Sequence, residues 1–174
     1  MAQKDKISRR DFFRGMAKKV GFRDWSAGDM SGLHPKLRDA DAFLKNAEYA
    51  RARETYEQFL QEEPGHLQAL RMAGYCCLRL QETENARQYW EKVETKRPSD
   101  EFCILYRGLS HARDGSLDLA MQTWKSYFNI HKPRIQREIN VTLALFENGE
   151  ELDPGEVADN IEEAINRQKK GNSE

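Results

Sequence analysis

The same residue types return every 34 residues along this chain of 174 residues. Small residues fall on small residues and large aromatic residues on large aromatic residues, in the sets Ala52, Ala86 and Ala120; Tyr56, Trp90 and Trp124; Gly74 and Gly108; and Pro64 and Pro98. Self-similarity at a fixed period of this length is typical of stacked helix-turn-helix units, each of which buries apolar surface only against its neighbours. The period therefore predicts a repeat array rather than one globular core.

The stretch of residues 67–98 carries the pattern most completely, with Leu70, Ala73, Gly74, Ala86, Trp90 and Pro98 at the spacing of one unit. On these residues the stretch resembles the tetratricopeptide repeat (TPR). The resemblance implies an all-α, TPR-like helical-repeat solenoid of about three helix-turn-helix units plus C-terminal capping helices. It also implies a non-enzymatic scaffold or adaptor that binds a peptide or helix in its concave groove.

The period divides the chain into an arm, three repeats and a closing region. The expected bounds are 1–32 for a basic, flexible or amphipathic-helical arm, 33–66, 67–100 and 101–134 for the repeats, 135–168 for a degenerate fourth unit and capping helix, and 169–174 for a frayed tail. Pro133 is expected to end the third repeat, and Pro154 to begin the closing helix. Because glycine costs about 1 kcal/mol relative to alanine inside a helix, Gly74 indicates a close helix approach, with Ala86 as the expected partner.

Composition supports a repeat array and argues against several other classes. The chain is 39% hydrophobic and 33% charged, which suits units that expose much of their surface. A net charge of -1 argues against a nucleic-acid-binding protein. No stretch approaches the roughly 18 consecutive apolar residues that a membrane-spanning helix needs. The three cysteines lack a CxxC spacing and are expected to be buried packing residues.

The amino-terminal arm contains a motif that resembles the twin-arginine export signal. The motif is the run Ser8, Arg9, Arg10, Asp11, Phe12, Phe13 and Arg14. An export signal continues into an apolar segment of about 7–15 residues, but here Lys18, Lys19 and Arg23 interrupt the region that follows. We therefore expect a protein retained in the cytoplasm, with an exported periplasmic assembly factor as the alternative.

The same arm has the pattern of a basic amphipathic helix. Phe12, Met16 and Val20 recur at helical spacing, and residues 1–23 contain eight Lys or Arg against two Asp. Such a helix binds anionic membrane surfaces or docks into a partner's groove. We expect the arm to provide a second contact, to a membrane face or to a partner in a redox complex. A peripheral membrane-surface module and a tail that docks on its own chain are the alternatives.

No group of residues has the spacing of a catalytic, metal or phosphate site. The four histidines are scattered without a partner at i+3 or i+4, and no glycine-rich phosphate loop is present. We expect no enzymatic activity, no cofactor and no metal.

The resemblance to TPR proteins implies which residues line the groove, because the first helix of each unit faces the concave side in that family. The predicted groove residues are Arg71, Tyr75, Arg79, Phe102, Leu105, Tyr106, Leu109, Arg113 and Asn140. Arginine holds carboxylates in two-point contact and aromatic rings provide area at low entropic cost. We therefore expect a protein partner with apolar and acidic groups. The alternative is that these aromatic residues pack against the closing helix or the arm; the oligomeric state is left open.

Overall fold

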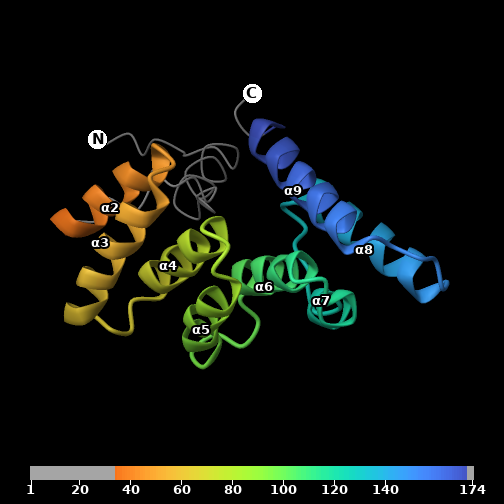
Figure 1. Ribbon diagram of the computed structural model, residues 1–174, viewed down its shortest axis with the longest axis horizontal. Helices are drawn as coiled ribbons and strands as arrows, with labels where there is room; N and C mark the ends of the chain where they lie inside the picture. The colour runs from red at the N-terminus through yellow and green to blue at the C-terminus, as the bar shows by residue number, and fades with distance from the viewer. Residues whose placement is uncertain (1–33, 172–174) are drawn as a thin grey trace, which may run out of the picture.

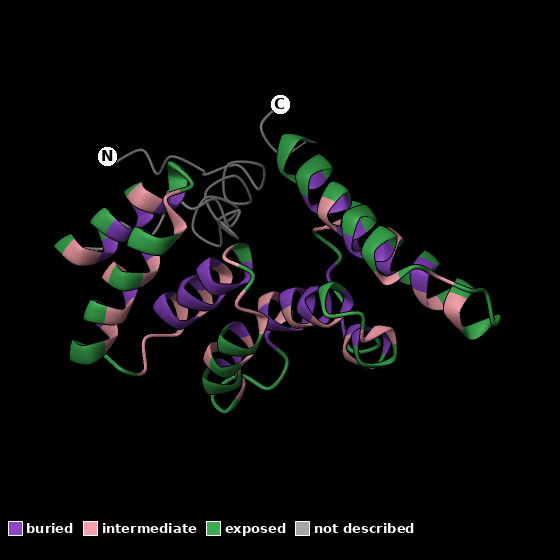
Figure 2. Cartoon of the chain, in the orientation of Figure 1, coloured by how far each residue is buried: buried purple, intermediate pink, exposed green. Residues whose placement is uncertain are grey.

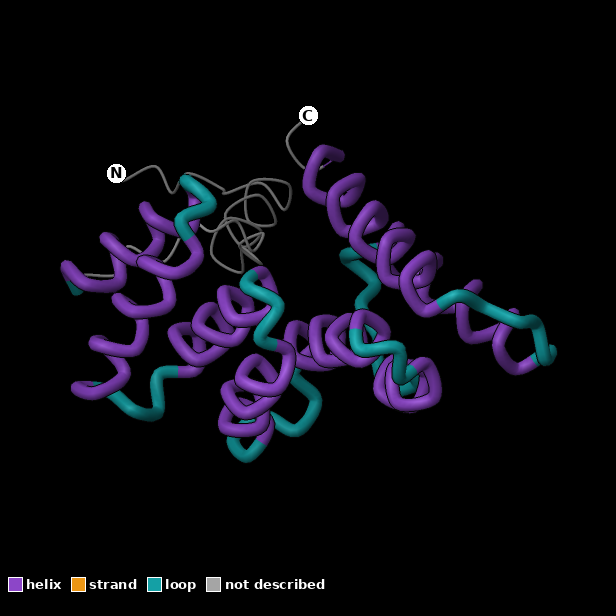
Figure 3. Tube along the Cα trace, in the orientation of Figure 1, coloured by secondary structure: helices purple, strands orange, loops and turns teal. Residues whose placement is uncertain are grey.

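The computed structural model describes residues 34–171, and within this range the chain consists of eight helices joined by short loops, with no strand (Figure 1, Figure 3). The helices are α2 (Pro35–Lys45), α3 (Tyr49–Glu62), α4 (Leu67–Arg79), α5 (Thr83–Glu94), α6 (Glu101–Arg113), α7 (Leu117–Trp124), α8 (Pro133–Glu147) and α9 (Pro154–Gly171). The all-α helical-repeat fold predicted from the sequence is confirmed. The arm and the last residues of the predicted tail lie outside the described range.

The helices pair in chain order, α2 with α3, α4 with α5, α6 with α7 and α8 with α9. Neighbouring pairs stack through α3 on α4 and through α5 on α6. Figure 1 shows the helices along an arc, with α2, α4, α6 and α9 bordering its inner side. The middle helices α4 and α6 carry the most buried residues (Figure 2), because each is packed from both sides of the array.

The turn inside each unit repeats the same backbone conformation at the 34-residue period. A positive φ occurs at Ala47, Gln81, Gly115 and Gly149, at 59°, 63°, 75° and 81°. At each turn this residue donates its N–H three residues back, and the next residue donates five residues back, as in Gln81 to Leu78 and Glu82 to Cys77. This is the Schellman arrangement that satisfies the last carbonyls of a helix. The backbone period therefore reaches Gly149, beyond the last clear repeat in the sequence.

The glycines of the second and third units leave room for a tryptophan ring, not for an alanine. A Cβ on Gly74 would lie 2.4 Å from Nε1 of Trp90, and one on Gly108 would lie 2.2 Å from Nε1 of Trp124. Each indole N–H also donates to a carbonyl of the first helix, Trp90 to Arg71 at 3.3 Å and Trp124 to Leu105 at 3.0 Å. The prediction that Gly74 accommodates Ala86 is therefore wrong, because Trp90, one turn further along α5, occupies the space.

In the first unit, different residues occupy the positions of the glycine and the tryptophan. Ala40 stands where the other units have glycine, and Tyr56 stands where they have tryptophan. Both are fully buried, and the Tyr56 hydroxyl donates to Oδ1 of Asp41 at 2.5 Å. Burial raises the pKa of Asp41, and the hydrogen bond from Tyr56 acts in the opposite direction. A smaller ring with a polar end thus fits against a helix that has a Cβ at this position.

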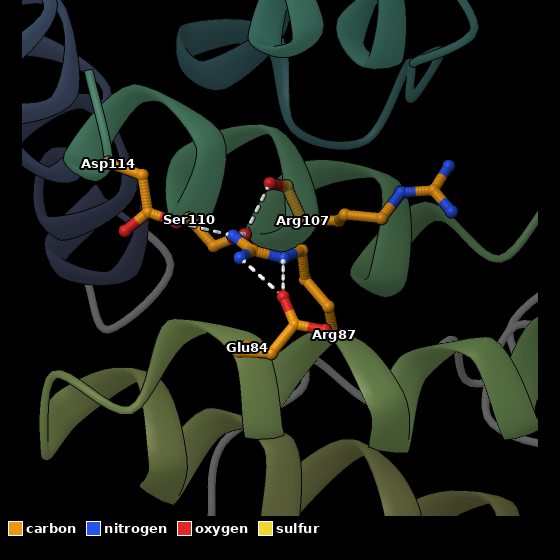
Figure 4. A network of polar contacts seen from close by, with 5 residues as sticks. All are labelled: Glu84, Arg87, Arg107, Ser110 and Asp114. Atoms are coloured by element: carbon orange, nitrogen blue, oxygen red, sulfur yellow. Dashed lines mark hydrogen bonds and ion pairs between the residues drawn. The ribbon is translucent and has the colours of Figure 1, made fainter. Parts of the chain in front are cut away.

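Arginines on the second helices tie each unit to the turn of the next. Arg53 of α3 contacts Glu82 at 2.5 Å, and Arg87 of α5, 34 residues later, contacts Asp114 at 2.6 Å. Figure 4 shows Arg87 between Asp114 and Glu84, with its Nη1 also donating to the Ser110 hydroxyl at 3.4 Å. Ion pairs that remain partly exposed contribute about 0–1 kcal/mol each, so these contacts help to set the relative position of neighbouring units more than their stability.

Two predicted boundaries of the C-terminal region are wrong. The third unit ends early, at Trp124, and Pro133 lies in the first turn of α8 rather than ending α7. Proline is tolerated there because the first N–H groups of a helix have no partner inside it. The closing helix continues to Gly171, past the predicted start of the frayed tail. Gln168 explains this extension, because it is buried and accepts from the backbone N–H of Arg134 at 3.1 Å.

The three cysteines are free and buried. Burial raises the pKa of Cys76 to about 12 and of Cys77 to about 11, and it raises that of Cys103 as well. The thiols are therefore small packing residues with little thiolate character. Within the part of the chain that the structure describes, no helix is both long and apolar enough to cross a bilayer.

Candidate interaction face

We define the first-helix face as the side of the array formed by α2, α4 and α6, where the sequence predicts the groove. The structure divides this face into two parts. The part on α6 is covered by α9, which packs against α6 as well as against α8. The part on α2 and α4 has no comparable contact with α9.

The apolar groove residues predicted in the third unit are buried beneath α9. Leu105, Tyr106 and Leu109 are 3%, 4% and 1% exposed, and Phe102 is half-buried beside them. They share one core cluster with Val157, Ala158, Ile161 and Ile165 of the closing helix. The expectation that they line an open groove is corrected, since two apolar helix stripes lower the free energy by removing each other from water.

Arg113 is also held by the closing helix. Its Nη2 lies 2.8 Å from Oδ1 of Asp159 and 3.1 Å from Oε2 of Glu162. An apolar stripe flanked by carboxylates is the chemistry predicted for a partner, and on α6 the chain's own α9 provides it. The alternative that the groove packs against the closing helix thus holds for the third unit.

Arg71 connects two units instead of facing a partner. Its Nε donates to Oδ1 of Asp100 at 3.1 Å and its Nη2 pairs with Oδ2, while only 14% of the Arg71 side chain is exposed. Asp100 also accepts from the backbone N–H of Cys103 at 3.1 Å and so caps α6. Although burial opposes it, Arg71 holds the pKa of Asp100 below its ordinary value. The prediction that Arg71 is open to a partner carboxylate is corrected, because an internal carboxylate already occupies it.

The part of the face on α2 and α4, which α9 does not cover, combines tyrosine rings with cations. Tyr75 is half-buried, with its ring centroid 5.2 Å from that of Tyr106 and 6.3 Å from that of Tyr49. The exposed guanidinium of Arg79 lies 5.1 Å from the centre of the Tyr49 ring. Glu162 of α9 is close enough to act electrostatically on Tyr75 and Arg79, so α9 borders this surface. The sequence predicted Tyr75 and Arg79 but missed Tyr49, whose position beside α4 depends on the turn before α3.

One Lys or Arg lies in the last turn of each of α2, α4 and α6, and we call these residues the cation row. The row is Lys45 of α2, Arg79 of α4 and Arg113 of α6, spaced by 34 residues. A cation in the last turn stabilises the helix dipole by about 0.3–1 kcal/mol, so the position alone does not indicate binding. Arg113, however, holds two carboxylates of a packed helix. Within residues 34–171 neither Lys45 nor Arg79 forms an ion pair.

Two further groups of predicted residues lie elsewhere. Asn140 is exposed on α8, where it lines a separate groove of about 580 Å³ with Ile130 and Val141, and so it does not join the other predicted groove residues. The arm residues Arg9, Arg10, Phe12, Phe13 and Arg14 lie outside the described residues.

Comparison with known proteins agrees with this architecture. Residues 37–101 match the family model described as tetratricopeptide repeat, a range that runs from α2 to the first residue of α6. No curated protein matches the chain. Repeats of this family generally mediate protein–protein interactions and are typically not catalytic. Among the described residues, no three His, Cys, Asp or Glu side chains form a group that would hold a metal ion.

Proposed function

We propose that this chain, whose residues 37–101 match the tetratricopeptide repeat model, is a non-enzymatic scaffold or adaptor that binds an acidic amphipathic segment of another protein. The binding surface is the part of the first-helix face that α9 does not cover, with Lys45, Tyr49, Tyr75 and Arg79. The observation that carries the proposal is the contact of Arg113 with Asp159 and Glu162. This contact supports the proposal because Arg113 already binds carboxylates of a packed helix, as we propose for Lys45 and Arg79.

The proposed partner contacts are based on those that the closing helix α9 makes with α6. On α6, apolar residues of α9 pack against Leu105 and Leu109 while carboxylates at its edge contact Arg113. One period earlier, Tyr75 occupies the position of Leu109 and Arg79 that of Arg113. A helix or extended segment lying across α4 and α2 would place apolar side chains on Tyr49 and Tyr75 and carboxylates near Arg79 and Lys45. Tyrosine and arginine are also the residues most enriched at binding hot spots.

Replacing Arg79 with glutamine is expected to weaken binding of such a segment about 10- to 100-fold, because a hydrogen bond to a charged group contributes roughly 1.5–3 kcal/mol. Amphipathic peptides with carboxylates spaced as in α9 are selected from a display library on the intact chain. The affinity of the selected peptide is then measured for each variant by fluorescence anisotropy.

The chain offers a matched control for this experiment. Arg51 lies 4.0 Å above the Phe43 ring and pairs with Glu48, so it also stacks on an aromatic ring, but it belongs to the second helix of its unit. Arg51→Gln should leave the affinity unchanged. Equal losses for both variants, or an unchanged affinity for Arg79→Gln, would reject this surface as the binding site.

The arm is proposed to act as a second contact of a protein that stays in the cytoplasm, in the assembly of a membrane or redox complex. The support is the cluster of lysines and arginines that interrupts the segment after Arg9 and Arg10. A reporter that is active only after twin-arginine export, fused to residues 1–40, should give no signal. Export of the reporter would instead support the periplasmic assembly factor. Salt-sensitive binding to anionic vesicles that is lost without residues 1–23 would support the membrane-surface module.

A further inference from the structure

A second surface, on the opposite end of the array from α2, is apolar and exposed. Phe128 and Ile130 in the loop before α8 are each 68% exposed, and Val141 and Leu145 of α8 are 44% and 40% exposed. Ile130 and Val141 line the groove of about 580 Å³ that contains Asn140. Large apolar side chains clustered on one helix face are typical of an interaction surface, whereas single exposed apolar residues are not informative.

The placement of α9 explains why this surface is uncovered. In the preceding units the second helix packs on the next first helix, as α5 packs on α6. At the end of the array α9 takes the contact with α6, and α8 touches α7 only slightly. Figure 1 shows α8 extending beyond α7 at the end of the arc. The face of α8 that carries Val141 and Leu145 is therefore left without a helix against it among the described residues.

The charges along α8 are arranged opposite to those that suit an isolated helix. The first turn contains no acidic residue and the last turn no basic one. Instead Arg134 and Arg137 are exposed near the start, where Arg134 also donates to the carbonyl of Arg167 at 2.6 Å. Glu147 is exposed at the end, 3.1 Å from Nζ of Lys125, and Glu150 and Glu151 follow it. Glu138 is the acidic residue next to Arg137, but unlike Arg137 it does not line the groove. The helix dipole disfavours cations at the start of a helix and anions at its end, but the same polarity makes α8 complementary to an antiparallel copy of itself.

We propose that this surface is a two-fold interface between two copies of the chain, with α8 packed antiparallel on α8. Val141 lies near the two-fold axis, and Arg137 of each copy lies near the acidic end of the other α8, at Glu147. An interface of this kind uses the same patch on both copies and closes without leading to longer assemblies. The apolar residues provide the association and the charges at the two ends fix the antiparallel direction. Dimerisation goes beyond the proposed function and leaves Lys45 and Arg79 accessible to a partner.

Sedimentation equilibrium of the full-length chain tests the interface. The wild-type protein is expected to be a dimer whose dissociation constant rises at least 100-fold in the double variant Val141→Glu, Leu145→Glu. Both side chains are exposed, so the helical content should not change. Leu119→Glu is the matched control, because Leu119 is a 48% exposed leucine on α7 that does not line the groove. A wild-type monomer at every concentration, or a dimer that Val141→Glu, Leu145→Glu leaves intact, would overturn the proposal.

Disulfide trapping tests the two-fold axis itself. Under oxidised glutathione, which takes up the two electrons and two protons released by a pair of thiols, Val141→Cys should form a covalent dimer. Leu119→Cys should not. The three native cysteines are buried and do not interfere. Failure of Val141→Cys to cross-link in a sample that sediments as a dimer would place the interface elsewhere and reject the α8 assignment.

Discussion

Replacing Trp90 with alanine should lower the free energy of unfolding by about 3–5 kcal/mol, the usual cost of removing a buried tryptophan from a core. Trp90 is fully buried, packs against Gly74 of α4 and donates its indole N–H to Arg71. It also shares a core cluster with residues of α6, so its loss should loosen the second unit and its contact with the third. Urea denaturation followed by circular dichroism measures the change.

A double-mutant cycle with Gly74 tests the stated reason for this loss. Gly74→Ala alone should cost about 1–3 kcal/mol from overpacking, even though alanine favours a helix by about 1 kcal/mol over glycine. The pair Gly74→Ala, Trp90→Tyr reproduces the Ala40 and Tyr56 combination of the first unit. It should therefore cost less than the sum of its two single variants. Strictly additive costs would show that the glycine and the ring do not constrain one another.

Replacing Asp100 with alanine should lower the free energy of unfolding by about 3–5 kcal/mol at neutral pH, because it leaves the guanidinium of Arg71 without its carboxylate partner. The change also removes the cap of α6, since Asp100 accepts from the backbone N–H of Cys103. Arg51→Ala is the control for an exposed pair, with Glu48 as its partner, and should cost less than about 1 kcal/mol. Equal costs for the two variants would contradict the structural role of Asp100.

The pH dependence of stability gives an independent check on Asp100. Its pKa in the folded chain lies below the ordinary value of 3.8, so its stabilisation is complete above that value and is lost as the pH falls through the folded pKa. Asp100→Asn removes this titration. Its stability should approach that of the wild-type protein between pH 4 and the acid-unfolding region, with the largest difference at neutral pH. A constant difference throughout this range would contradict the lowered pKa.

The repeat itself could be predicted from the sequence because its signals are local. The alanines Ala52, Ala86 and Ala120 recur at one interval, and so does the pair formed by Gly74 and Trp90. Which small residue meets which large one depends on the rotation of two helices about their axes. Ala86 and Trp90 lie one turn apart on the same face, and the sequence pattern does not distinguish them. The fold was therefore predicted correctly, whereas the packing partner of Gly74 was not.

The occupancy of the first-helix face could not be predicted for a different reason. Leu105, Tyr106 and Leu109 have the chemistry to bind a helix, and burial against an external partner or against α9 removes the same apolar area from water. A helix on the same chain has a high effective concentration at the site, and α9 therefore covers α6. These residues were predicted to bind a partner, but in the structure they pack against a helix of the chain itself.

We propose that Lys45 and Arg79, with Tyr49 and Tyr75, bind a partner in the way that Arg113 binds α9. The most direct measurement is hydrogen exchange of the full-length chain with and without a selected acidic amphipathic peptide. We expect new protection at the C-terminal turns of α2 and α4 and at the start of α3, with α6 and α8 unchanged. Protection confined to α3 and α5, or exposure of α6 through displacement of α9, would contradict it.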